Sequence, residues 1–115
     1  MLVVDDDPAV VEKLREVLES HGVTVHAATN AESAIRLLGE HELCGLVLDL
    51  VLESGSGFDV LHHLSKQKMA IPTIVVTAKL PSYVREMLNA EQVKLVFPKP
   101  VDARLLGTIV LGLCG

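Results

Sequence analysis

The chain shows short apolar runs that are separated by longer segments in which apolar residues recur at helical spacing. The runs expected to form strands are 2–4, 23–28, 45–48, 74–76 and 93–97. Continuously apolar runs such as 45–48 and 74–76 are typical of strands that are buried on both faces of a parallel sheet. The segment 23–28 instead alternates in polarity, which predicts a half-exposed strand at the edge of that sheet.

The segments between these strands predict helices, and most of them open with a residue that suits a helix start. Asp7 precedes Pro8, so an N-cap is followed by proline at the first helical position. Gly22 is expected to end this first helix. The other expected helix starts are Asn30, the Gly/Ser loop 54–57, Ser82 and Asp102.

Strand and helix therefore alternate five times, which predicts an α/β protein with helices on both faces of a parallel sheet. Because the alternating segment 23–28 belongs at an edge, the expected strand order is 2-1-3-4-5, as in a flavodoxin-like (βα)5 three-layer sandwich. The 115 residues suit one domain. We expect a single domain over 1–115, with no output domain in it.

The charge and the cysteines narrow the classes of function. The net charge is −5 and there is no run of Lys or Arg, so we expect no nucleic-acid binding by this domain. No secretory signal and no apolar stretch long enough to cross a bilayer is visible, so we expect a cytoplasmic protein that does not contact membranes. Cys44 and Cys114 are expected to be small buried thiols of a reducing compartment rather than a disulfide.

Ionisable and hydroxyl residues follow four of the expected strands. Asp5 and Asp6 follow the first strand, Asp49 the third, Thr77 the fourth and Lys99 the fifth. The carboxyl ends of parallel strands form the ligand-binding edge of such a sheet. We therefore expect three carboxylates, a hydroxyl and an ammonium group to converge on one small site.

Three clustered carboxylates raise one another's pKa unless a cation lies among them. Mg²⁺ is the expected cation, because it takes carboxylates, waters and phosphate oxygens as ligands. Asp49 stands inside an apolar run, where an unpaired carboxylate is costly. It is the expected phosphoryl acceptor, with Thr77 donating a hydrogen bond to the phosphoryl group and Lys99 offsetting its charge.

Four segments of the chain resemble those of response-regulator receiver domains: 2–8, 48–50, 75–78 and 98–100. Gly57 also matches the glycine that follows the phosphorylation loop in that family. The resemblance covers the whole chain. It implies a phosphoacceptor that catalyses its own phosphorylation and dephosphorylation, and not an enzyme with a separate substrate. The implied phosphodonor is a sensor histidine kinase or a phosphotransfer protein in a two-component phosphorelay.

The resemblance also assigns roles to single residues. Asp5, Asp6 and Asp49 would hold Mg²⁺ together with the backbone carbonyl of Val51, and Asp49 would take the phosphoryl group from a phosphohistidine. Asp7 would be a helix cap. The peptide bond between Lys99 and Pro100 would be cis, a form that proline makes accessible.

Three positions depart from the family pattern. Leu52-Glu53 stands where the family often has Met-Pro. Val96 occupies the position of the aromatic switch residue, three before the lysine. Glu91-Gln92-Val93 replaces the usual Gly-Ala before the last strand. The departures leave the acceptor chemistry intact and leave open how phosphorylation is relayed to the rest of the domain.

Two other functions remain as alternatives. A haloacid-dehalogenase-like phosphatase would use Asp5 as the nucleophile and Asp7 as the acid/base, but it would leave Asp49 without a role. A receiver-like binding module that is never phosphorylated would lack some of the acids, and none is missing. The adjacent His62 and His63 face different directions on a helix and make a poor metal site.

The last expected helix is apolar on two stripes, Leu105/Ile109/Leu113 and Leu106/Val110. One packing face does not need both. We expect either that the face formed by the fourth helix, the last strand and the last helix binds a second copy or another partner, or that a polar continuation of the helix is simply not part of this sequence.

Overall fold

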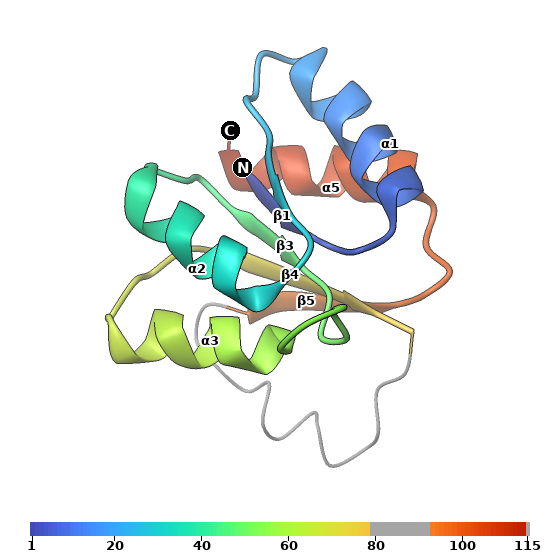
Figure 1. The fold of residues 1–115 in the computed structure, drawn as a ribbon. Coiled ribbons are helices and arrows are strands. Elements are labelled where there is room, and N and C mark those ends of the chain that lie inside the picture. Colours follow the sequence, from blue (N-terminus) through green and yellow to red (C-terminus); the bar gives the residue numbers. More distant parts are fainter. Residues whose placement is uncertain (79–92, 115) are drawn as a thin grey trace.

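The computed structural model describes residues 1–78 and 93–114 (Figure 1). Its elements are β1 (Leu2–Val4), α1 (Pro8–Glu19), β2 (His26–Ala28), α2 (Ala31–Glu40), β3 (Leu46–Leu48), α3 (Gly57–Lys66), β4 (Thr73–Thr77), β5 (Val93–Pro98) and α5 (Ala103–Cys114). The helix expected after Ser82 lies outside the described residues.

The five strands form one parallel sheet in the order β2-β1-β3-β4-β5. This confirms the predicted α/β fold and places β2 at an edge. The strand predicted over 23–28 is shorter than expected and covers only His26–Ala28. Pairing starts late because β1 itself begins at Leu2, and because the amide of Val23 donates to the carbonyl of Leu18 at the end of α1.

Helices cover both faces of the sheet, so the molecule has three layers and two apolar cores (Figure 1). Successive strand residues point to opposite faces. In β1, Val4 packs with α2 and α3, whereas Val3 packs with α1 and α5. Val3 and Val4 are adjacent in the strand, yet both are fully buried. Burial on both faces explains why β1, β3 and the middle of β4 are continuously apolar.

The predicted helix caps at Asp7, Asn30 and Asp102 are confirmed. Asp7 Oδ1 accepts a hydrogen bond from the amide of Ala9 at 3.0 Å, and Asn30 Oδ1 accepts one from Ser33 at 2.8 Å. Asp102 Oδ1 accepts one from Arg104 at 3.0 Å. These caps satisfy amides that the first turn of a helix leaves free, and they fix where each loop ends beside the sheet edge.

The two apolar stripes of α5 have different environments. Leu106 and Val110 lie in the core that α5 shares with α1. Gly107 lets the two helices approach closely, since a Cβ there would lie 2.8 Å from Cγ1 of Val17. Leu105, from the other stripe, is 58% exposed. The buried stripe is therefore a packing face.

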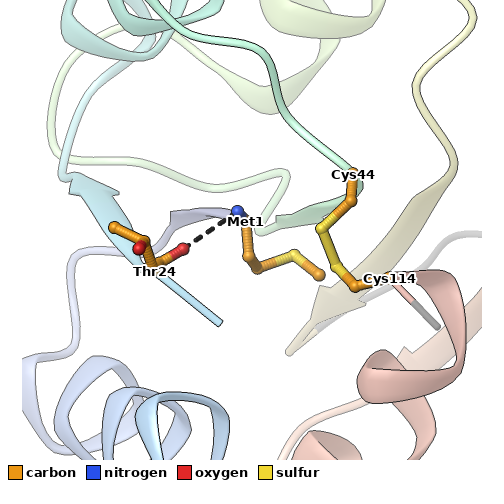
Figure 2. Close-up of a disulfide and its surroundings, with 4 residues drawn as sticks. All are labelled: Met1, Thr24, Cys44 and Cys114. Carbon is orange, nitrogen blue, oxygen red and sulfur yellow. Dashed lines mark hydrogen bonds between the residues drawn. A yellow bond between two sulfur atoms is a disulfide. The ribbon is translucent and has the colours of Figure 1, made fainter. Parts of the chain in front are cut away.

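The expectation of two separate buried thiols is wrong. Cys44 and Cys114 form a disulfide with 5.0 Å between their Cα atoms (Figure 2). Cys44 is exposed and Cys114 is half-buried. The two cysteines are 70 residues apart in sequence, and no local pattern indicates that the start of β3 and the end of α5 meet.

Within the described part of the chain, no helix is long and apolar enough to cross a membrane.

Candidate functional site

The predicted site residues lie where four of the parallel strands end. We call this side of the sheet, formed by the C-terminal ends of the strands, the carboxyl edge. Asp5 follows β1, Asp49 follows β3, Thr77 ends β4 and Lys99 follows β5. Asp5 and Asp49 are 1% and 4% exposed, and Thr77 is fully buried. The parallel sheet thus gathers residues that are up to 94 positions apart in the sequence.

Lys99 joins the two buried carboxylates. Its Nζ lies 2.8 Å from Oδ2 of Asp49 and 3.0 Å from Oδ2 of Asp5. The backbone places the side chain, because the amide of Lys99 donates to the carbonyl of Thr77 at 2.8 Å. The peptide bond to Pro100 is cis, as the resemblance implies. One ammonium group therefore offsets only part of the negative charge of two carboxylates that lie mostly out of water.

Backbone amides hold the remaining carboxylate oxygens. Oδ1 of Asp5 accepts a hydrogen bond from the amide of Asp7 at 2.9 Å. Oδ1 of Asp49 accepts one from the amide of Val51 at 3.0 Å. Each carboxylate therefore has a fixed orientation before any ligand arrives, and the loop after β3 is tied directly to Asp49.

The three acids expected to bind metal lie close together. Carboxylate oxygens of Asp5, Asp6 and Asp49 lie within 4.8 Å of one another. Asp6 is exposed, so this side of the group is open to solvent. Hard oxygen ligands with room for water suit Mg²⁺. The donor set fits the expected cation, for which Asp5 and Asp49 would be buried ligands and Asp6 a ligand at the solvent side.

Burial and charge act in opposite directions on the pKa values of the site. Burial raises the pKa of Asp5 above its ordinary value, although hydrogen bonds from Asp7 and Lys99 oppose the change. Burial by itself would lower the pKa of Lys99, but its hydrogen bonds to Asp49 and Asp5 outweigh burial and raise it. Lys99 is therefore firmly protonated at neutral pH.

The hydroxyl group of Thr77 is an unusual feature of the site. Its oxygen is buried and has no hydrogen-bond partner among residues 1–78 and 93–114. A buried polar group without a partner is costly, and such groups mark places where a ligand can complete the bonding. Thr77 stands at the end of β4, beside the strand that leads to Asp49.

The loop between β3 and α3 forms the outer wall of the site. The side chain of Val51 is 63% exposed. Gly57 allows the chain to turn back, because a Cβ at Gly57 would collide with the carbonyl oxygen of Asp49 and lie 2.8 Å from Cα of Leu50. This tight return explains the glycine noted in the sequence.

Sequence reasoning missed one contact beside the site. The hydroxyl of Thr29 donates to Oε1 of Glu53 at 2.7 Å, and the amide of Ala31 donates to the carbonyl of Ser54 at 3.2 Å. These bonds join the loop after β2 to the loop after β3. Glu53 stands where the family often has proline, so the altered position has a partner of its own.

Two of the altered positions concern the switch. Val96 in β5 is 36% exposed. Glu91 and Gln92 lie outside the described residues.

Comparison with known proteins identifies the class. The family model described as the response regulator receiver domain matches residues 1–111. The chain is 32% identical over 118 aligned positions to the protein PilH of Pseudomonas aeruginosa, and the alignment covers 100% of this chain and 98% of PilH. It is 33% identical over 79 positions to the response regulator SaeR of Staphylococcus aureus, covering 69% of this chain and 34% of SaeR.

Solved structures agree on the fold. A CheY-like response regulator receiver domain from Methanospirillum hungatei superposes with a TM-score of 0.84 at 24% identity, covering 98% of this chain and 91% of that one. The receiver domain of the Francisella response regulator 1452 gives a TM-score of 0.83 at 22% identity, with 97% and 93% covered.

The chain belongs to the response regulator receiver domain family, whose members act in two-component signalling. The membership settles the class that the sheet order and the site had indicated. It sets aside the dehalogenase-like alternative, in which Asp5 would be the nucleophile. The matched part of SaeR is about a third of that protein, so nothing that SaeR does as a whole is transferred to this chain.

Proposed function

We propose that this domain accepts a phosphoryl group on Asp49 from the phosphohistidine of a sensor histidine kinase or phosphotransfer protein, in a reaction that needs Mg²⁺. One observation supports the assignment most directly. Asp49 is a buried carboxylate whose Oδ2 forms an ion pair with Nζ of Lys99 at 2.8 Å. A carboxylate oxygen of Asp49 also lies within 4.8 Å of carboxylate oxygens of Asp5 and Asp6. We place this transfer in the cytoplasm, the compartment of ATP-dependent kinases.

The transfer begins with a carboxylate oxygen of Asp49 as the nucleophile. It attacks phosphorus, the P–N bond of the phosphohistidine breaks, and the imidazole leaves with its electron pair. Lys99 already contacts Oδ2 of Asp49, so its ammonium group stays beside the charge that the new acyl phosphate carries. Asp5, Asp6, Asp49 and the carbonyl of Val51 would hold Mg²⁺, which neutralises the phosphoryl oxygens when it is bound.

Thr77 supplies the second proposed interaction with the product. Its buried hydroxyl has no partner among the described residues, so a phosphoryl oxygen would give it one. The gain exists only in the phosphorylated state, and a ligand shifts a conformational equilibrium only through such a difference. With a valine at position 96, we assign the relay to the movement of Thr77 toward the phosphoryl group.

The acceptor is tested with a small acyl phosphate and Mg²⁺, followed by intact-protein mass spectrometry. Wild type should gain one phosphoryl group that is labile to alkali, and both Asp49→Asn and chelation of Mg²⁺ should abolish the gain. Asp7→Asn is the matched control, because asparagine caps a helix as well as aspartate. An Asp49→Asn variant that still gains an acid-stable phosphate would rule out Asp49.

The same variants test the phosphatase alternative. Turnover of an aryl phosphate ester that is lost in Asp7→Asn, but kept in Asp49→Asn, would identify the pair of Asp5 and Asp7 as catalytic. We expect no turnover by any of the variants.

We also propose that phosphorylation strengthens contact with a second copy through β5 and α5. Leu95, Val96 and Leu105 are exposed apolar side chains on these elements, at 44%, 36% and 58%. Sedimentation with and without a beryllofluoride mimic should show association that Leu105→Glu removes. Leu106 and Val110 are unsuitable for this test because they are core residues. A domain that stays monomeric with the mimic contradicts the dimer and leaves the receiver assignment intact.

A further inference from the structure

The opposite side of the sheet, formed by the N-terminal ends of the strands, carries a disulfide. We call this side the amino edge. Here the exposed loop before β3 meets the last turn of α5, and Cys44 is joined to Cys114 (Figure 2). The backbone at Gly45 allows the approach. A Cβ on this residue would lie 2.9 Å from Cε of Met1 and 3.1 Å from Cδ1 of Leu113. The last turn of α5 is thus packed against the start of β3 by apolar contacts as well as by the sulfur bridge.

The disulfide is accessible to reagents in solution. Cys44 is exposed, and Cys114 is only half-buried. A shallow groove of about 660 Å³ lies beside Cys44 and is lined also by His41, Glu42, Met69 and Ile71. A small thiol or disulfide can therefore approach Cys44 from this groove without opening the core. In a reducing compartment, an accessible disulfide of this kind is transient and redox-sensing rather than structural.

We propose that Cys44 and Cys114 form a second site of this protein, a redox site that reacts with small-molecule thiols and disulfides and that fastens the end of α5 when it is oxidised. In oxidation, the Cys44 thiolate attacks one sulfur of a small disulfide and expels the first thiolate, which takes up the proton that Cys44 lost. The Cys114 thiolate then attacks the Cys44 sulfur and expels the second. The two protein thiols are oxidised, and the small disulfide is reduced to two thiols.

Reduction follows the reverse path. A small thiolate attacks the sulfur of Cys44, because this sulfur belongs to the exposed residue, and Cys114 leaves as a thiolate. The last turn of α5 is then held by packing alone, chiefly by Leu113 against Gly45. The helix begins at Ala103, which follows closely after Lys99, and ends at Cys114. The redox site therefore acts on the far end of the helix that continues from the phosphoacceptor site.

The proposal does not depend on the proposed acceptor chemistry. Cys44 precedes β3 and Asp49 follows it, so the two sites lie at opposite ends of the same strand. Oxidation should change the mobility of α5 and leave the formation of the acyl phosphate unchanged. Oxidation would then affect the C-terminal end of α5, and phosphorylation would affect its N-terminal end.

The test equilibrates wild type with reduced or oxidised glutathione and measures both states without any substitution. Mass spectrometry should show that oxidation removes two hydrogens and leaves no free thiol. Amide exchange in 111–114 should be about tenfold slower or more in the oxidised state. The melting temperature should rise on the order of 10 °C on oxidation, since the bridge closes a loop of 70 residues.

Cys44→Ser and Cys114→Ser are the controls. Each should behave as the reduced wild type does in both buffers, apart from glutathione attached to the remaining thiol. Three results overturn the proposal: two free thiols in the oxidising buffer, a stable glutathione adduct on wild-type Cys44, or equal exchange of 111–114 in the two states. Labelling of Asp49 that changes between the two states would show that the sites are not independent.

Discussion

The carboxyl edge and the amino edge of the sheet are stabilised by different kinds of interaction. At the carboxyl edge, Asp5 and Asp49 are buried charges that share one ammonium group and two backbone amides. At the amino edge, Gly45 and Leu113 make apolar contact and a disulfide closes the junction. The first arrangement can exchange ligands, because each bond is non-covalent and solvent reaches Asp6. The second changes only when electrons are transferred.

The two edges also differ in the atoms that a side chain in place of glycine would contact. At Gly57 the neighbours are backbone atoms of Asp49 and Leu50, which cannot move without displacing the carboxylate of Asp49. At Gly45 the neighbours are side-chain atoms: the ends of Met1 and Leu113 and, at 3.3 Å, Cβ of Leu113. We therefore expect the carboxyl edge to be the more rigid of the two, as a prearranged ligand set requires.

The largest effect is expected from Gly57→Ala. The added methyl group collides with the backbone of Asp49, and the free energy of unfolding should fall by about 3 kcal/mol. Urea denaturation measures the change, and Mg²⁺ affinity should fall with it. Gly39→Ala is the matched control in α2, where nothing lies within 4 Å of the added Cβ, and it should stabilise by roughly 0.5–1 kcal/mol. Equal effects of the two substitutions would contradict the close approach at Gly57.

Lys99→Met should have the next largest effect. It leaves two buried carboxylates without their cation, which should lower the free energy of unfolding by about 2 kcal/mol in the absence of metal. Mg²⁺ should restore more stability to this variant than to wild type, because the metal no longer competes with an ammonium group. Melting curves with and without Mg²⁺ measure this difference.

The exposed Lys13→Met serves as the control for Lys99→Met. Lys13 makes a surface pair with Glu16 at 3.8 Å, and such pairs contribute little. A Lys99→Met variant with the same Mg²⁺ response as wild type would show that Lys99 does not compete for the acids.

Val51→Asn should change the lifetime of the acyl phosphate. The valine side chain is exposed beside Asp49 and cannot orient water, whereas an amide can, so loss of phosphate should become roughly tenfold faster. The decay of the phosphorylated protein after removal of the donor is the measurement. Val51→Leu has nearly the shape of the asparagine variant without its amide, and it should decay at a rate close to wild type. If the Asn and Leu variants decay equally, water orientation at this position is not limiting.

The smallest effect is expected at the amino edge, from Gly45→Ala. Met1 and Leu113 can move their side-chain ends by a few tenths of an ångström, so the loss of stability should be about 1 kcal/mol or less. The same denaturation experiment as for Gly57→Ala gives the comparison. A loss at Gly45 that equals or exceeds the loss at Gly57 would reverse the order of rigidity proposed for the two edges.

The carboxyl edge could be predicted from the sequence because its signals are local. Each site residue directly follows an apolar run, as Asp49 follows Leu46–Leu48, and parallel strands place their ends together. The strand order followed from the one run that alternates. The chemical roles of Asp49, Thr77 and Lys99 stay predictions, as does the helix after Ser82.

The amino edge could not be predicted, because its contacts join distant segments that carry no local signal. Nothing near Cys44 indicates Cys114, and apolar neighbours in sequence did not make either residue buried in space. The bond between Thr29 and Glu53 was missed for the same reason, since it joins two loops that are 24 residues apart. The late start of β2 was missed as well, because it depends on the backbone bond between Val23 and Leu18 and not on the polarity pattern.

The bridge between Cys44 and Cys114 also changes the connectivity of the polypeptide. It makes a covalent ring that contains Asp49, Thr77 and Lys99, while Asp5 and Asp6 stay on the linear segment outside it. A single proteolytic cut anywhere inside the ring leaves both products attached to each other until the sulfur bond is reduced. The oxidised chain can therefore be cleaved between Asp49 and Lys99 and still keep both parts of the site on one molecule.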